Sequence, residues 1–517
     1  MHRCLLIDEI LEVIFSQSGR RTLCSLARTC QAFHEPATAL IWQDIMGLWP
    51  ILRLLPAATA TSWTEQRGAD PESDERHGPP IVVTRPLKSE EWLIFKRLSQ
   101  RVRDIHVIVT QKPRCYSITP GSLSLLLHPP GNESLESLFP NVQHLSFRCQ
   151  GFSLETSDYQ NHVLTLLRIF VRPQLSTLEL LLGGTLYVPL NASGILASCP
   201  NLRTLHTVTD SLETREGFPA FVTPDISSFQ SLETVRIHDV SWDLLASLAQ
   251  KKTLRCLVIN FRRPLGSPAP PPTNEAFVGL RYLSTHIASL ELTLRFYRWA
   301  SFSELRTLSI LATDFARSDY SEDLEELLTL IPLHRPFLER IHVNLGFAPP
   351  RQPRHWVLTK SILTPYLSLR HLKVLDITLA SRSYSPQLTD DDLMQMVQCW
   401  PLLIELHLKT YTCGWVLPTG LSLGGIAALI QLCPNLEGFS LVFNATEIPK
   451  IACHPDGNPV QNTKIRSLQV GNSPISSPEN VAMYLRLLMP GLHVASTCNT
   501  MDSTHKMHWK TVSALLA

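Results

Sequence analysis

The sequence lacks the short motifs on which several large classes of enzymes and metalloproteins depend. Its twelve cysteines include no C-x-x-C pair, and the chain contains no G-x-x-x-x-G-K-[ST], H-E-x-x-H or G-x-G-x-x-G motif. Structural zinc modules, phosphate-cradling loops, zinc proteases and dinucleotide sites therefore have no signal in this sequence. We expect neither a metal nor a cofactor.

The chain also has little net charge and no long apolar run. A formal net charge of +1 over 517 residues provides no global field that would attract nucleic acid or an anionic membrane. The longest apolar stretch, residues 178–190, is interrupted by charge, glycine and proline, and it is shorter than the roughly 20 residues of a membrane span. The charged N-terminus does not resemble a signal peptide. We expect an intracellular protein, cytoplasmic or nuclear, without nucleic-acid or membrane partners.

Three short amphipathic helices are predicted within the first 45 residues. The apolar residues of the first recur at helical spacing and form one stripe: Ile7, Ile10, Leu11, Ile14 and Phe15. A second stripe covers residues 23–30, and a third runs to Ile45 from Pro36, a residue suited to a first helical turn. Helices this short cannot bury a stable core alone, so we expect them to need a partner surface.

These helices carry three motifs: L-I-D-E-I-L-x-x-I-F at 6–15, L-x-x-L-A-R-T-C-x-x-F at 23–33 and L-I-W at 40–42. Together they resemble the F-box of fungal F-box proteins. In that family the helices bind a small Skp adaptor, which links the protein to a cullin and RING ubiquitin ligase. The resemblance implies a receptor subunit that selects targets and does not itself transfer ubiquitin. It assigns the following residues to adaptor binding: Leu6, Ile7, Ile10, Leu11, Ile14, Phe15, Leu23, Leu26, Phe33, Leu40 and Trp42.

The remainder of the chain contains a degenerate L-x-x-L-x-L repeat. Its thirteen copies begin at Val102, Val142, Leu175, Leu202, Leu232, Leu254, Ile287, Leu305, Leu338, Leu372, Leu403, Leu436 and Ile465. The intervals between copies range from 18 to 40 residues and average about 30, which suits one strand and one helix per repeat. We therefore predict an α/β fold, a leucine-rich-repeat-like solenoid with a parallel sheet.

The predicted organisation has three parts: an F-box-like helical module at 1–56, a linker or loop at 57–87 and an irregular repeat solenoid with a C-terminal helix at 88–517. The linker is rich in charge, glycine and proline. Helices are predicted at 89–100, 163–170, 323–330, 391–397, 426–432 and 480–488. Several turns that follow such helices carry proline, as in the C-P-N-L segments at 199–202 and 433–436, and they resemble the junctions of F-box leucine-rich-repeat proteins.

Residues that alternate with the repeated leucines are expected on the concave face of the sheet. They are polar, mixed in sign and rich in histidine: Asp104, His106, His144, Arg148, Glu179, Arg236, His238, Glu291, Arg340, His342, Asp376, Glu405, His407 and Lys409. From this set we select candidates for binding a target protein: His106, Arg148, Arg236, Arg340, His342, Glu405, His407 and Lys409. The alternative is that these residues are simply the solvated side of a sheet.

One catalytic pattern occurs. The segment G-L-S-L-G at 420–424 matches the G-x-S-x-G nucleophile elbow of hydrolases, which requires a strand that leads directly into it. Pro418 precedes the segment and a predicted helix follows it, so Ser422 is better explained as a helix N-cap. We predict a non-enzyme. Three functions remain: a ubiquitin-ligase receptor, a non-catalytic repeat scaffold that does not bind the adaptor, and, more remotely, a hydrolase that uses Ser422.

Overall fold

The chain forms two compact units, Met1–His238 and Asp239–Ala517. The computed structural model describes residues 7–60, 81–110, 117–131, 133–150, 165–182, 198–209, 226, 229–238, 240–261, 276–287, 290–312, 321–333, 335–345, 356–379, 384–410, 420–450, 459–497 and 503–517. No helix within these ranges is long and apolar enough to cross a membrane.

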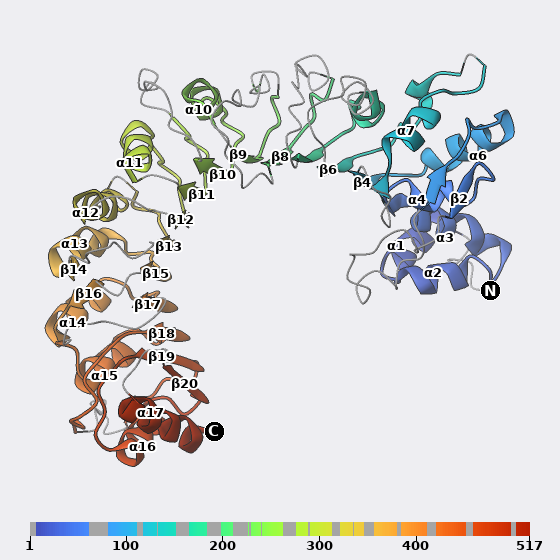
Figure 1. Ribbon diagram of the computed structural model, residues 1–517. Coiled ribbons are helices and arrows are strands. Elements are labelled where there is room, and N and C mark those ends of the chain that lie inside the picture. Colours follow the sequence, from blue (N-terminus) through green and yellow to red (C-terminus); the bar gives the residue numbers. More distant parts are fainter. Residues whose placement is uncertain are drawn as a thin grey trace. The chain divides into compact units, whose positions relative to one another are not determined.

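The first unit begins with three packed helices: α1 (Asp8–Ser16), α2 (Arg20–Leu26) and α3 (Gln31–Gln43) (Figure 1). Their shared core consists of Leu11, Phe15, Leu23 and Ala37, and the ring of Phe15 meets that of Phe33 edge to face. The predicted start of the third helix at Pro36 is wrong, because α3 begins five residues earlier and Pro36 lies inside it. The missing amide of one proline costs a single helical hydrogen bond, and the burial of Pro36 and Ala37 offsets that loss.

A short strand joins these helices to the sheet. β1 (Asp44–Met46) follows α3 directly and pairs in parallel with β4 (Asp104–Thr110), with Ile45 opposite Ile105. The backbone N–H of Arg103 also donates to the carbonyl of Gln43 at 2.8 Å. Ile45, expected on a helix, is therefore a strand residue. The helical module continues the sheet of its unit through this pairing.

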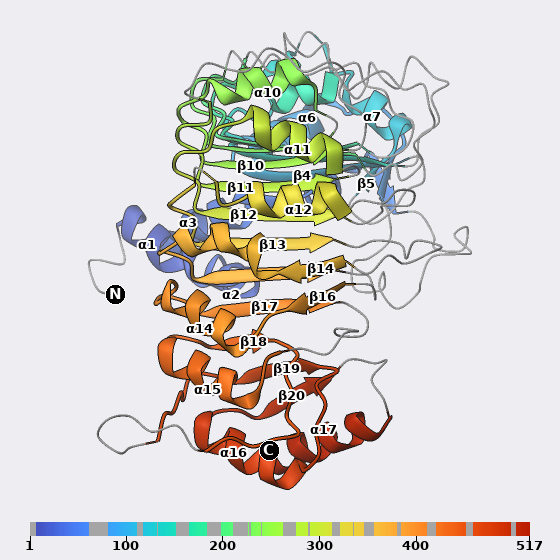
Figure 2. The ribbon, with the colours of Figure 1, turned by 90° about the vertical axis from the view of Figure 1, so that its left-hand side faces the viewer.

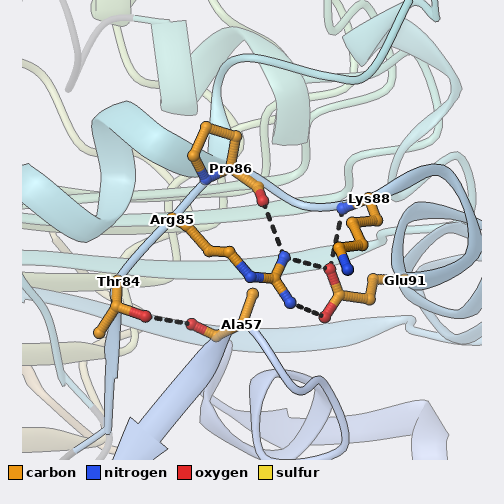
Figure 3. A network of polar contacts seen from close by, with 6 residues as sticks. All are labelled: Ala57, Thr84, Arg85, Pro86, Lys88 and Glu91. Carbon is orange, nitrogen blue, oxygen red and sulfur yellow. Dashed lines mark hydrogen bonds and ion pairs between the residues drawn. The ribbon is translucent and has the colours of Figure 1, made fainter.

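The ends of the predicted linker are ordered strands. β2 (Ala58–Ala60) and β3 (Ile81–Val83) form a small antiparallel sheet, and residues 61–80 lie outside the described part of the chain. Near it, α4 (Trp49–Leu52) precedes β2, and α6 (Ser89–Ser99) follows β3. The hydroxyl of Thr84 donates to the carbonyl of Ala57 at 3.2 Å, which holds the two ends of the segment together (Figure 3).

An ion pair between buried Glu91 and partly exposed Arg85 fixes the start of α6. The guanidinium of Arg85 donates to both carboxylate oxygens of Glu91 at 2.7 and 2.9 Å, and the backbone N–H of Lys88 donates to the same carboxylate at 2.8 Å (Figure 3). Hydrogen bonding to Arg85 is the largest cause that lowers the pKa of Glu91 to about 2. Glu91 therefore caps its own helix and binds the chain that enters it.

The main sheet of the first unit is parallel and follows the order of the chain. After β1 and β4 it contains β6 (His144–Gln150), β7 (Thr177–Leu182), β8 (Thr204–Thr209) and β9 (Thr234–His238), and β5 (Ser117–Ile118) pairs with β4. Helical segments lie between the strands: α7 (Pro120–Leu126), η3 (Leu135–Ser137) and residues 165–170. The predicted helix at 163–170 is helical over its described residues.

The second unit has the same plan. Its parallel strands, in chain order, are β10 (Cys256–Phe261), β11 (Tyr282–Ile287), β12 (Thr307–Ala312), β13 (Arg340–Leu345), β15 (Val374–Leu379), β17 (Glu405–Thr410), β18 (Gly438–Ser440), β19 (Ser467–Gly471) and β20 (Val494–Thr497). A separate parallel pair is formed by β14 (Trp356–Thr359) and β16 (Tyr384–Gln387). Each strand pairs with the strand of the next repeat, so the fold is a leucine-rich-repeat-like solenoid.

The helices of the second unit lie on one face of its sheet (Figure 2). They are α10 (Trp242–Ala249), α11 (Leu290–Trp299), α12 (Ser321–Leu330), α13 (Lys360–Leu363), η5 (Thr364–Ser368), α14 (Asp390–Gln398), α15 (Leu423–Leu432) and α16 (Pro478–Leu488). The last helix, α17 (Ser503–Leu516), lies at the end of the sheet beside β20, where the hydroxyl of Ser513 bonds the backbone of Ala495. The helices predicted at 323–330, 391–397, 426–432 and 480–488 are confirmed. In each unit we call the sheet face that bears residues alternating with the buried leucines the open face.

One predicted repeat has the wrong register. A repeat was predicted to begin at Ile287, but Ile287 is the last residue of β11, and α11 follows it. Glu291, predicted on the concave face of the sheet, therefore lies on a helix. The true opening residue is Leu280, which is fully buried and divides the interval between Leu254 and Leu305 into 26 and 25 residues. The repeat at Ile287 was predicted wrongly because the pattern I-x-x-L-x-L also has the i, i+3 spacing of an amphipathic helix. β20, opened by buried Leu492, adds a further copy at the C-terminal end.

Buried side chains connect successive repeats at the turns. The thiol of Cys199 donates to the carbonyl of Arg172 at 3.1 Å, the thiol of Cys433 lies 3.8 Å from that of Trp400, and the amide of Asn462 donates to the carbonyls of Cys433 and Leu436. Burial raises the pKa of both thiols to about 12, which makes them unreactive. The C-P-N-L turns thus use cysteine to satisfy the carbonyl of the preceding repeat.

An arginine is buried among the aromatic side chains of the second unit. Arg335 is 4% exposed and lies over the rings of Tyr297 and Phe302. Its guanidinium donates to the carbonyls of Leu330 and Ile331, both at 2.6 Å, at the end of α12. A cation there satisfies carbonyls that the helix cannot pair and complements the helix dipole.

Candidate functional site

The residues assigned to adaptor binding divide into a core set and a surface set. Leu11, Phe15 and Leu23 are buried in the helical core, and Leu26, Phe33 and Leu40 pack against it. Trp42 is half-buried, and Leu6 lies outside the described residues. The surface set consists of Ile7, Ile10 and Ile14, which are 45, 36 and 46% exposed.

A fourth apolar side chain, Val13, extends this surface and is 68% exposed. At 100° per residue, Ile10, Val13 and Ile14 occupy one arc of α1 beside the arc of Leu11 and Phe15, and Ile7 is the N-cap residue at the start of the helix. We call these four residues the α1 stripe. The sequence pattern did not distinguish the two arcs, because helical periodicity shows which side of a helix is apolar but not how much of that side the protein itself covers.

The second part of the site is a line of polar residues on the open face of the second unit. The strand register places His342 opposite Asp376, Asp376 opposite His407, His407 opposite Ser440 and Ser440 opposite Gln469. We call these five residues the polar row. His407 Nδ1 lies 2.9 Å from the hydroxyl of Ser440, which in turn donates to Gln469 Oε1 at 2.9 Å. These two hydrogen bonds join three consecutive repeats through side chains that are 33 and 29 residues apart in the sequence.

Two acidic residues at this row are paired with its histidines. Asp376 lies 3.9 Å from His342, and Glu405 lies 3.4 Å from His407 Nε2. Burial by itself raises the pKa of Asp376, but interactions with His342 and Thr378 and the charge of Lys409 lower it below its usual value. Burial lowers the pKa of His407, and Lys409 lowers it further, against the opposing effect of Asp376 and Glu405. The row is a coupled set of charges in a partly desolvated surface.

The structure brings five of the predicted target-binding residues together in the second unit. Arg340 and His342 lie on β13, and Glu405, His407 and Lys409 lie on β17, with β15 between them. Ser440, which is itself buried, and Gln469 were missed, although they alternate with the buried Phe439 and Leu468 as the predicted residues alternate with their leucines. That alternation is the signal that would have found them.

The first unit carries the remaining candidates on its own open face. His106, Arg148 and Arg236 are exposed on β4, β6 and β9, while His238 is half-buried at the end of β9. Glu179 pairs with His206 of the neighbouring strand at 3.2 Å, and Asp104 contacts His144. His206 was another omission of the sequence analysis.

Ser422 has the surroundings of a helix N-cap. Its hydroxyl donates to Asp390 Oδ2 at 2.5 Å and accepts the backbone N–H of Gly424 at 3.0 Å and of Gly425 at 3.4 Å. A side chain at Gly425 would overlap the carboxylate of Asp390, which explains the glycine there. Among the described residues no histidine contacts Ser422, whereas a serine nucleophile needs an adjacent base. Nor does that part of the chain bring together three or more histidine, cysteine or acidic residues able to hold a metal ion.

Neither a protein-family model nor a curated protein matches this chain. Among solved structures, the crystal structure of the mouse RP105/MD-1 complex matches at 12% identity over 77% of this chain and 70% of the matched chain, with a TM-score of 0.35. The crystal structure of the Rad7 and Elc1 complex in yeast matches at 14% identity over 78% of this chain and 88% of the matched chain, with a TM-score of 0.32. The fold described above rests on the strand order and register of this chain.

Proposed function

We propose that this protein is an intracellular substrate-recognition subunit of a Skp, cullin and F-box ubiquitin ligase, without catalytic residues or a cofactor of its own. Helices α1 to α3 bind the Skp adaptor, and the open face of the repeats binds the target protein. The assignment of the ligase comes from the F-box-like motifs of the sequence. The structure supports it through one observation, the α1 stripe.

The α1 stripe is apolar surface that the helical core does not use. Leu11 and Phe15 close the core from one side of α1, while Ile7, Ile10, Val13 and Ile14 remain between about a third and two thirds exposed. Burying an aliphatic side chain fully contributes about 1.5–3 kcal/mol, so covering the exposed parts of these four, about two side chains in total, would contribute roughly 3–6 kcal/mol to association. An apolar arc of this kind on a short surface helix indicates a protein partner.

The attachment of the module suits this role. Pairing of β1 with β4 and the ion pair of Glu35 with Arg101, at 2.6 Å, connect the three helices directly to the sheet of the first unit. An adaptor bound at α1 would therefore be held in a fixed position relative to that sheet, as a receptor subunit requires.

The test is direct binding of the purified full-length chain to a fungal Skp adaptor, measured by biolayer interferometry. Ile10→Asp with Ile14→Asp introduces two charges into the α1 stripe and should weaken binding at least tenfold. Leu93→Asp is the matched control, because Leu93 is 61% exposed on α6, outside the three-helix module. Leu11→Ala and Phe15→Ala are unsuitable, since both remove core residues and would abolish binding by unfolding the helices.

Circular dichroism should show that the α1 variant and the control keep the helical content of the natural chain. Binding that survives the two aspartates, or no binding by the natural chain, would contradict the proposal. In the second case the chain would be a repeat scaffold whose helices only cover the end of the solenoid.

A further inference from the structure

The charges on the open face of the second unit are paired unequally. Its two acidic residues, Asp376 and Glu405, each have a histidine within ion-pair distance. Its two permanent cations, Arg340 and Lys409, have neither a hydrogen bond nor an ion pair within the described part of the chain, although the charge of Lys409 acts on Asp376 through space. The acidic groups are thus already engaged, and the cations are available.

The first unit repeats this arrangement on its own open face. Asp104 and Glu179 are paired with His144 and His206, whereas Arg148 and Arg236 are exposed and have no ion-pair partner among the described residues. In both units each of these acidic side chains is paired with a histidine, which carries no permanent positive charge. A sheet face that is only exposed to solvent does not require its acidic side chains to be paired with histidines while its arginine and lysine side chains stay unpaired.

Complementarity of charge then defines the partner. A basic ligand would have to displace histidines from Asp376 and Glu405 and would approach Arg340 and Lys409 at a repulsive cost, whereas an acidic ligand meets two unpaired cations. One arginine and one lysine on different strands also do not form the arginine cluster that a phosphate group requires. Separate carboxylates fit this surface better.

The register gives the spacing of those carboxylates. Arg340 lies opposite Val374, and Val374 lies opposite Glu405, which is four residues before Lys409 on β17. Two steps between strands and four residues along one strand place the Cα atoms of Arg340 and Lys409 about 16 Å apart. An extended peptide rises about 3.3 Å per residue, so the span corresponds to about five residues.

We propose that the open face of the second unit binds an extended acidic segment of the target protein, in which two carboxylates about five residues apart contact Arg340 and Lys409. The segment crosses β15 diagonally and lies over the polar row. This inference rests on the proposed function only in identifying the ligand as part of a ubiquitination target. The binding itself does not depend on the adaptor.

An array of synthetic peptides tests the proposal. Fifteen-residue peptides on a serine and alanine background carry two aspartates separated by two to eight positions, with parallel sets in which lysine or phosphoserine replaces aspartate. The full-length chain, fluorescently labelled, is applied at pH 7.5 and low salt. The expected result is strongest retention by the aspartate peptides near a spacing of five and little retention by the lysine set.

Charge-reversal variants connect the signal to the surface. Arg340→Glu with Lys409→Glu should reduce retention at least tenfold, and Arg370→Glu with Lys510→Glu, which changes the net charge equally at exposed positions away from the open face, should leave it unchanged. Equal loss in both double variants, no dependence on spacing, or retention of phosphoserine peptides alone would overturn the proposal. Adaptor binding is measured on the same samples, and its absence would contradict the ligase function while leaving the peptide result standing.

Discussion

The ion pair between Arg85 and Glu91 gives a prediction for the pH dependence of stability. Glu91 is 5% exposed and accepts hydrogen bonds from the Arg85 guanidinium and the Lys88 backbone. Its folded-state pKa of about 2 lies below the ordinary value of 4.5. A carboxyl whose pKa is lowered by folding stabilises the protein above its unfolded pKa, and that stabilisation is lost as the pH falls from about 4.5 toward 2.

The magnitude follows from the size of the shift. A lowering from 4.5 to about 2 corresponds to about 3 kcal/mol of stability at neutral pH. The side chain of Arg85 is 37% exposed, so solvent screens part of this interaction and we expect roughly half, about 1.5 kcal/mol. Glu91→Gln should therefore destabilise the first unit by about 1.5 kcal/mol at pH 7, and more than half of this difference should have disappeared at pH 3.

Hydrogen exchange along a urea gradient, measured on peptides that cover residues 88–100, reports the unfolding of α6. The natural chain, Glu91→Gln and Glu90→Gln are compared at pH 7, 5, 4 and 3. Glu90 lies on the same helical turn but is exposed, so its substitution should have a small effect without dependence on pH. A difference between Glu91→Gln and the natural chain that stays constant from pH 7 to pH 3 would refute the reasoning.

Three further predictions concern the second unit. Ser422→Ala removes the N-cap of α15 and should lower thermal stability by about 1 kcal/mol in differential scanning calorimetry, while any esterase activity lost with it would contradict the non-enzyme assignment. Arg335→Met leaves the carbonyls of Leu330 and Ile331 without donors and should cost about 2–4 kcal/mol in the same assay, and Arg335→Lys, which lacks the guanidinium fork, should not restore it. Retention of the aspartate peptides should increase as the pH falls below the ordinary histidine pKa of 6.5, because a bound anion favours protonated His407, whose pKa burial and Lys409 lower against Asp376 and Glu405. The same increase in His407→Gln would refute this origin.

The sequence predicted the elements whose residues are specified locally. α12 and α14 follow from an apolar stripe preceded by acidic residues, and every strand opened by a buried leucine except β11 and β20 begins where the predicted repeat places it. The prediction of a repeat at Ile287 was wrong because the residues that begin a strand of this repeat and those that begin an amphipathic helix have the same short apolar spacing. Only the regular intervals on either side of Leu280 distinguish the two possibilities. β1 could not be predicted, since three residues after a helix form a strand only because β4 offers them hydrogen bonds.

In the candidate site, too, the features specified by neighbouring residues could be predicted, and those that depend on other repeats could not. Alternation along β17 was sufficient to place Glu405, His407 and Lys409 on one face, because a strand of period two requires it. Which of them would be paired was not accessible, because His407 contacts Ser440 of the next repeat, 33 residues away, as well as Glu405 of its own strand. A charged side chain that is paired within the chain is less able to contact a ligand than one that is unpaired. The recognition chemistry of this face therefore depends on the register between repeats, and an insertion that shifted β15 by one residue against β17 would separate Asp376 from His407 without changing any residue of the site.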